Sequence, residues 1–132
     1  MNAVLKKKIN LLIHLALVDG ELDIRELAFI YNVCIRNGID LDTIGDLIEQ
    51  REPLEDMTTM STEARIDHIT DCLVLTLIDG KVLPKETSFV MEIAKHLGID
   101  QAAMESLVQN LGSELTATPD EIRSRVTKII AG

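Results

Sequence analysis

Apolar residues fall in runs along the chain whose spacing is that of helices rather than strands. The segments Ile9–Val18 and Cys72–Ile78 are almost entirely apolar, which is typical of helices buried on most sides. Few β-branched or aromatic residues alternate with polar ones, so strands have little support. The pattern predicts an all-α protein: one compact domain of about seven helices.

The chain contains an internal repeat. Shifted by 60 residues, the segment 15–40 aligns with the segment 75–100 without gaps, and self-similarity of this kind indicates a duplicated structural unit. We therefore expect two pseudo-symmetric helical repeats within a single domain 1–132: one over about 5–50, one over about 65–110, and a separate C-terminal helix over about 119–131. The identical positions are Leu15/Leu75, Leu17/Leu77, Asp19/Asp79, Gly20/Gly80, Glu26/Glu86, Phe29/Phe89, Gly38/Gly98, Ile39/Ile99 and Asp40/Asp100.

Turn and capping residues divide each repeat into three helices. An Asp-Gly turn ends the first helix, at Gly20 and Gly80, and Gly38 and Gly98 end the second, because glycine tolerates the left-handed conformation found there. The second helix begins with a capping box at Asp23 and Glu26 in one copy, and with Pro84 and Glu86 in the other. Asp40 and Asp100 are expected to cap the third helices, and Thr118 to Glu121 form a capping box before the last one.

Composition and charge narrow the possible partners. The 132 residues are 46% hydrophobic and carry a net charge of −9, which argues against disorder and against a nucleic-acid partner. Cys34 and Cys72 have no metal or redox spacing, so they are interpreted as buried side chains in a reducing compartment. One acidic cluster is interpreted as a solvated face and loop; it comprises Asp40, Asp42, Asp46, Glu49, Glu52, Glu55 and Asp56.

The N-terminal segment imitates a signal peptide. Lys6, Lys7 and Lys8 precede the apolar run, but that run is too short to span a bilayer and contains His14. It also leads into Asp19-Gly20-Glu21 rather than into a cleavage site of small residues. We therefore expect a core helix, no direct insertion into a membrane, and a cytoplasmic protein.

The carboxylates of the Asp-Gly turns are the candidate chemistry. Asp19 and Asp79 fall at the C-terminal end of a helix, where the helix dipole disfavours negative charge. Either backbone N–H groups of the turn or a bound cation would compensate, and oxygen ligands favour Ca²⁺ or Mg²⁺. An EF-hand is rejected, because two of its ligand positions would fall on Leu15 and Leu17. For Glu26 and Glu86, the capping box offers a structural explanation.

With these turns the sequence resembles the tellurite-resistance TerB-like family. The resemblance covers roughly residues 5–112 and rests on Leu15 to Leu22, on Glu26, and on the same pattern in the second copy. It implies a compact seven-helix fold, a bacterial stress role without catalysis, acidic metal-binding positions, and a protein partner near the membrane. Lys81 and Leu83 replace Glu21 and Asp23 in the second copy, a departure from two equivalent sites. The candidate metal ligands are Asp19, Glu21, Asp23, Glu26, Asp79 and Glu86.

Three functional hypotheses follow. The leading one is a non-enzymatic module whose acidic turns bind a divalent cation or a protein partner. The second is an interaction or scaffold protein in which these turns only cap helices. An enzyme that uses carboxylates is the weakest, because His14, His68 and His96 are isolated from any cysteine or serine at a diagnostic spacing, and no glycine-rich phosphate loop is present.

Overall fold

A computed structural model of the chain describes residues 3–18, 20, 23–78, 82–113 and 117–131. These described residues form seven α-helices and no strand, which confirms the all-α prediction. The helices are α1 (Ala3–Ala16), α2 (Ile24–Arg36), α3 (Leu41–Glu49), α4 (Thr62–Leu77), α5 (Pro84–His96), α6 (Gln101–Ser113) and α7 (Pro119–Ala131). The first and fourth helices begin earlier than their apolar runs, because their first turns are amphipathic and half-exposed.

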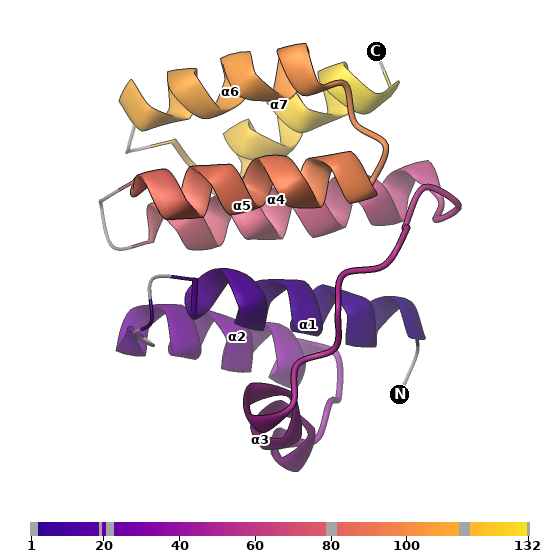
Figure 1. Cartoon of the computed structure of the whole chain (residues 1–132), viewed down its shortest axis with the longest axis vertical. Coiled ribbons are helices and arrows are strands. Elements are labelled where there is room, and N and C mark those ends of the chain that lie inside the picture. Colours follow the sequence, from indigo (N-terminus) through magenta and orange to yellow (C-terminus); the bar gives the residue numbers. More distant parts are fainter. Residues whose placement is uncertain (1–2, 19, 21–22, 79–81, 114–116, 132) are drawn as a thin grey trace.

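The helices stack along the longest axis of the molecule. α1 and α2 form one layer, α4 and α5 the next, and α6 and α7 an outer layer, while α3 closes the opposite end (Figure 1). α1 contacts α2, α3, α4 and α5, and α4 packs against α1, α5 and, most extensively, α7. The two nearly apolar helices predicted from the sequence therefore form the centre of the core.

Burial follows the apolar pattern of these two central helices. Seven of the last eight residues of α1 are buried, including Ile9 and Leu12, which have no exposed surface. In α4 the buried positions continue from Ile66 to Thr76 and include Ile69, which is also fully buried. At about 25 cal/mol per Å² of apolar surface, this burial is the main favourable term in folding.

The predicted caps form as hydrogen bonds. Asp40 accepts from the backbone N–H of Asp42 at 3.1 Å, and Asp100 accepts from that of Ala103 at 2.9 Å. At the start of α7, Thr118 Oγ1 accepts from the N–H of Glu121 while Glu121 Oε1 accepts from the N–H of Thr118. These bonds satisfy N–H groups that have no partner inside the helix.

Local structure recurs at the 60-residue interval in the first two helices of each unit. α2 and α5 both have 13 residues and begin 60 residues apart. Each is followed by a glycine with positive φ, 68° at Gly38 and 72° at Gly98. The third helices differ: α3 has nine residues and is seen end-on, whereas α6 has 13 and is seen from the side (Figure 1).

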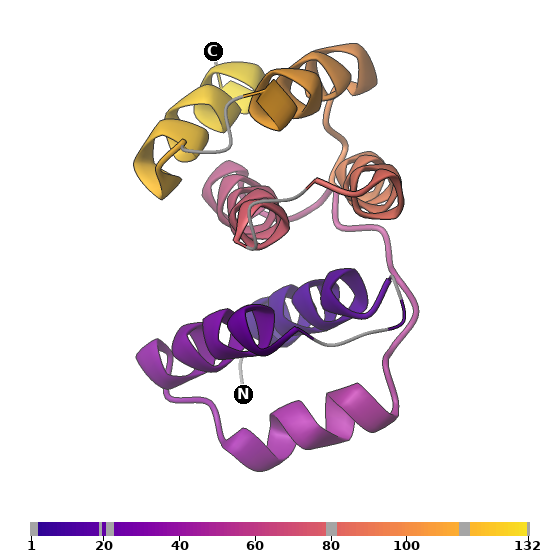
Figure 2. The same cartoon turned by 90° about the vertical axis from the view of Figure 1, so that its left-hand side faces the viewer.

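The linker between the units follows one side of the molecule from α3 to α4 (Figure 2). Asn10 of α1 donates from Nδ2 to the carbonyl oxygen of Glu52 at 2.9 Å and accepts from the Glu52 N–H at 3.0 Å. Farther along, the N–H of Met57 donates to the carbonyl of His96 at the end of α5, at 2.9 Å. Both units therefore hold the linker through its backbone.

Among the described residues, none of the helices combines the length and the apolar character that crossing a bilayer requires.

Candidate functional site

Three of the six predicted metal ligands lie outside the described residues. These are Asp19 and Glu21 of the first turn and Asp79 of the second. Gly20 is described, and its φ of 90° confirms the predicted left-handed glycine after α1. The other three predicted ligands, Asp23, Glu26 and Glu86, lie at the starts of α2 and α5.

Asp23 is the N-cap of α2, as predicted. Its carboxylate accepts a hydrogen bond from the backbone N–H of Arg25 at 2.7 Å, and the Arg25 guanidinium approaches it to 3.4 Å. The hydrogen bonds from the Arg25 side chain and backbone lower the pKa of Asp23 below its usual value. Asp23 therefore stays ionised at neutral pH, and part of its capacity to accept hydrogen bonds is already used by the helix.

Glu26 and Glu86 occupy the same position in the two units, and both are buried. Their exposed fractions are 4% and 3%, which is unusual because ionised glutamate is rarely buried unless it is paired or hydrogen-bonded. Glu86 Oε1 accepts from the backbone N–H of Leu83 at 3.3 Å, the return bond of a capping box. Both lie in the first turn of a helix, where the dipole stabilises negative charge.

The described residues contain no group of three or more His, Cys, Asp or Glu side chains arranged to hold a metal ion. The leucines that rule out an EF-hand lie where the sequence placed them. Leu15 and Leu75 are each 1% exposed, inside α1 and α4, so the first ligand positions of such a loop belong to the core.

The three histidines each contact a backbone carbonyl, and they lie on different helices. His14 Nε2 lies 2.7 Å from the carbonyl oxygen of Glu52, and its ring stacks on Phe89 with centroids 5.8 Å apart. His68 Nε2 lies 3.2 Å from the carbonyl of Val4. His96 Nδ1 lies 2.9 Å from the carbonyl of Glu92, one turn earlier in α5. All three contacts are structural in kind.

The lysine run of α1 forms a row of ion pairs. Lys6 contacts Glu52 at 2.8 Å, and Lys7 contacts Glu55 at 3.4 Å, so two acids of the linker are paired with the helix beside it. The third lysine, Lys8, pairs with an acid of α4. The run that imitates a signal peptide therefore binds linker and α4, and the acidic cluster is only in part a free solvated face.

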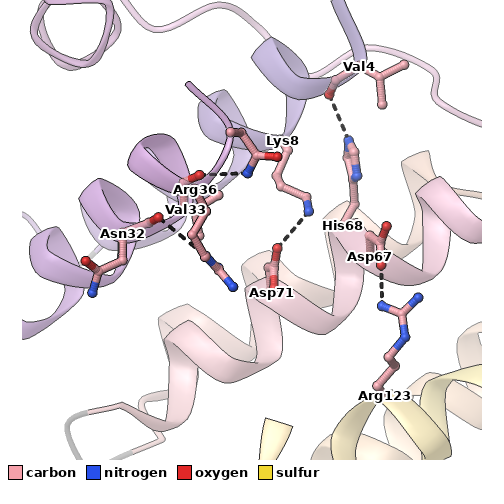
Figure 3. A network of polar contacts seen from close by, with 10 residues as sticks. Val4, Lys8, Asn32, Val33, Arg36, Asp67, His68, Asp71 and Arg123 are labelled. Carbon is pink, nitrogen blue, oxygen red and sulfur yellow. Dashed lines mark hydrogen bonds and ion pairs between the residues drawn. The ribbon is translucent and has the colours of Figure 1, made fainter. Parts of the chain in front are cut away.

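Lys8 and its partner belong to a polar junction of α1, α2 and α4 (Figure 3). Lys8 Nζ lies 2.8 Å from Asp71, and these side chains are only 14% and 23% exposed. Nearby, Arg123 of α7 pairs with Asp67. A cleft of about 220 Å³ opens here and is lined by Val4, Leu5, Lys8, Asn37, Ala64, Asp67 and His68.

Burial sets the protonation state of His68 in this junction. The side chain is 2% exposed, and loss of solvation, with a smaller contribution from the charge of Lys8, lowers its pKa. The imidazole is therefore neutral at neutral pH. Asn10, Lys8 and His68 were missed as partners in sequence because each bonds to a residue more than 40 positions away.

The largest described hollow lies beside α5. It measures about 620 Å³ and is lined by the end of α1, the linker and one face of α5, at Val18, Leu54, Pro84, Lys85, Ser88, Phe89 and Glu92. A second hollow of about 510 Å³ lies between α5 and α6. Both are open and of mixed polarity, and they suit a protein surface better than an enclosed small molecule.

Both cysteines are buried and free, as the sequence predicts. Burial raises the pKa of the Cys34 thiol to about 11 and raises that of Cys72 as well. Because the thiolate is the reactive form, neither side chain is a nucleophile at neutral pH.

Comparison of the chain with protein-family models, with curated proteins and with solved structures found no match. The resemblance to the TerB-like family therefore stays a prediction from the sequence motifs.

Proposed function

We propose that this chain is a non-catalytic, cytoplasmic binding module of the TerB-like kind, with a role in bacterial stress or tellurite resistance. In this proposal the duplicated acidic turns bind a divalent cation, Ca²⁺ or Mg²⁺, or a protein partner near the membrane. The observation that supports it best is the burial of Glu26 and Glu86 at equivalent positions directly after the two turns. Burying a carboxylate costs free energy unless a cation or hydrogen bonds compensate.

The metal part predicts that Ca²⁺ or Mg²⁺ raises the melting temperature. A cation at about 100 times its Kd would add about 2.7 kcal/mol, and each kcal/mol is worth roughly 3–5 °C for a domain of this size. The double variant Asp19→Asn plus Asp79→Asn should abolish the increase, because asparagine keeps the turn but loses the charge. The measurement is a thermal melt with and without about 5 mM cation.

A matched control is available in the same repeat. Asp40→Asn plus Asp100→Asn changes another duplicated pair of aspartates by the same charge, and asparagine is an equally good N-cap. This control should melt higher with cation, as the unaltered protein does. An unchanged melting temperature of the unaltered protein across the titration would exclude the metal.

A second candidate is a scaffold whose acidic turns only cap helices, and the bond from Leu83 N–H to Glu86 favours it. Here Glu86→Gln should cost little stability, because glutamine also completes a capping box, whereas Glu86→Ala should cost about 1 kcal/mol. Glu26→Gln and Glu26→Ala should behave alike. If instead the glutamine variants lose a cation-dependent rise in melting temperature, the glutamates are ligands and this candidate fails.

We place an enzyme that uses carboxylates last. Its histidines would have to leave the backbone carbonyls of Val4, Glu52 and Glu92 to take part in proton transfer. General acid–base catalysis needs such a group within hydrogen-bond reach of the substrate.

A further inference from the structure

α2 has an apolar outer face, which we name the α2 stripe: Ile24, Ala28, Tyr31 and Ile35. Their spacing of four, three and four residues places them on one side of the helix, opposite the buried Ile30, Val33 and Cys34. Ile24 is 80% exposed and Ile35 65% exposed, Ala28 is exposed, and Tyr31 is half-buried. α2 packs against α1 and α3, and the stripe faces away from the core.

The duplication provides an internal comparison for this face. Sixty residues later, α5 has Pro84, Ser88, Met91 and Lys95 at the equivalent positions. They have the same exposure as their counterparts: three are exposed and Met91 is half-buried. Since serine and lysine serve there, the fold itself does not require an apolar outer face on this helix. The apolar residues of the α2 stripe therefore call for an explanation outside the monomer.

We propose that the α2 stripe binds the same stripe of a second copy of this chain, with the two α2 helices antiparallel. The stripe is self-complementary under a two-fold axis: the pairs 24/35 and 28/31 have the same sum, 59. Ile24 then meets the partner's Ile35, and Ala28 meets the partner's Tyr31. A small residue thus faces a large one, as in close helix packing.

Charge supports the same register. Arg36 of one copy comes level with the partner's Asp23, because these positions also sum to 59. Arg36 is exposed, and the Asp23 side chain is 31% exposed. In a protein of net charge −9, the outer face of α2 presents two arginines, Arg25 and Arg36, while its internal acid Glu26 is buried. Two copies therefore repel each other less along α2 than along the acidic α3.

The stripe is short, and this limits the affinity. Its eleven-residue span is about 16 Å long at the rise of an α-helix, so two such helices bury less than the roughly 800 Å² per partner of a stable complex. We expect a reversible dimer with a Kd of roughly 10 μM to 1 mM.

Sedimentation velocity of the full chain over about 10 μM to 1 mM tests the dimer. The average mass should rise toward twice that of the monomer as the concentration increases. Ala28→Glu should weaken the dimer at least about tenfold, because it places a charge against the partner's Tyr31. Ile35→Lys, the residue found at position 95, should do the same. The matched control Ser88→Glu, at the equivalent exposed site of α5, should leave the dimer unchanged.

Cross-linking tests the antiparallel register. Ile24→Cys protein mixed with Ile35→Cys protein should form a disulfide-linked dimer on mild oxidation, and each variant alone should form much less. The native thiols are buried and serve as a common background. A monomer at every concentration, an equal effect of Ser88→Glu, or preferential linking of Ile24→Cys to itself would each overturn the proposal.

Discussion

Replacing Asn10 with alanine is expected to lower the free energy of unfolding by about 2–3 kcal/mol. The side chain is 5% exposed and makes two hydrogen bonds to the backbone of Glu52, one as donor and one as acceptor. Alanine removes both, and the partly buried Glu52 N–H then has no replacement in the helix. Urea denaturation at constant m-value measures the change.

Thr70 provides the matched control for this change. It lies 60 residues after Asn10 at the equivalent position of α4 and is likewise 5% exposed. Its Oγ1 is buried without a hydrogen-bond partner among the described residues. Thr70→Val replaces a buried hydroxyl by a methyl group of similar shape, so it should be neutral or stabilising. A cost of Asn10→Ala below that of Thr70→Val would contradict the role of Asn10 as the anchor of the linker.

A double-mutant cycle separates the two donors that converge on Glu52. His14→Phe keeps a ring against Phe89 but removes the bond from His14 Nε2 to the Glu52 carbonyl. After either single change that oxygen keeps one donor, and after both it keeps neither. The combined cost should therefore exceed the sum by about 0.5–1 kcal/mol. Additive costs would mean that the two side chains act on independent parts of the linker.

The helix starts and ends were predictable because their chemistry is local. Asp40 and Asp100 cap helices within three residues of themselves, and Gly38 and Gly98 occupy the left-handed conformation that only glycine adopts readily. The anchor at Asn10 was not predictable, because its partner is 42 residues away. An asparagine inside an apolar run signals a buried hydrogen bond but not which group accepts it.

The repeat shows where sequence similarity stops determining packing. α2 and α5 have the same length and the same buried face, because both the apolar spacing and the caps are duplicated. α3 and α6 differ in length and orientation, since α7 packs on α4 and α6, and the first unit has no counterpart of α7. The candidate site was predictable only in part for a similar reason. Asp23 and Glu86 are local caps, whereas the burial of both glutamates depends on the packing of the helices around them.

The second large effect is expected at Gly98. Gly38→Ala and Gly98→Ala both force alanine into a left-handed conformation, with φ of 68° and 72°, which costs about 1–2 kcal/mol. The two sites differ in space. A Cβ on Gly38 would meet nothing within 4 Å, whereas one on Gly98 would lie 3.0 Å from Thr58 Cγ2. Gly98→Ala should therefore cost about 1 kcal/mol more than Gly38→Ala.

Removing the opposing methyl group tests that cause. Thr58→Ser deletes Cγ2 but keeps the hydroxyl and the backbone N–H that donates to Asp56 at 2.9 Å. In the Thr58→Ser background, the cost of Gly98→Ala should fall to that of Gly38→Ala, and the cost of Gly38→Ala should not change. Urea midpoints of the four alanine-containing proteins and their parents give both differences. If Thr58→Ser leaves the cost of Gly98→Ala unaltered, the linker does not press on the turn after α5, and the extra cost has another origin.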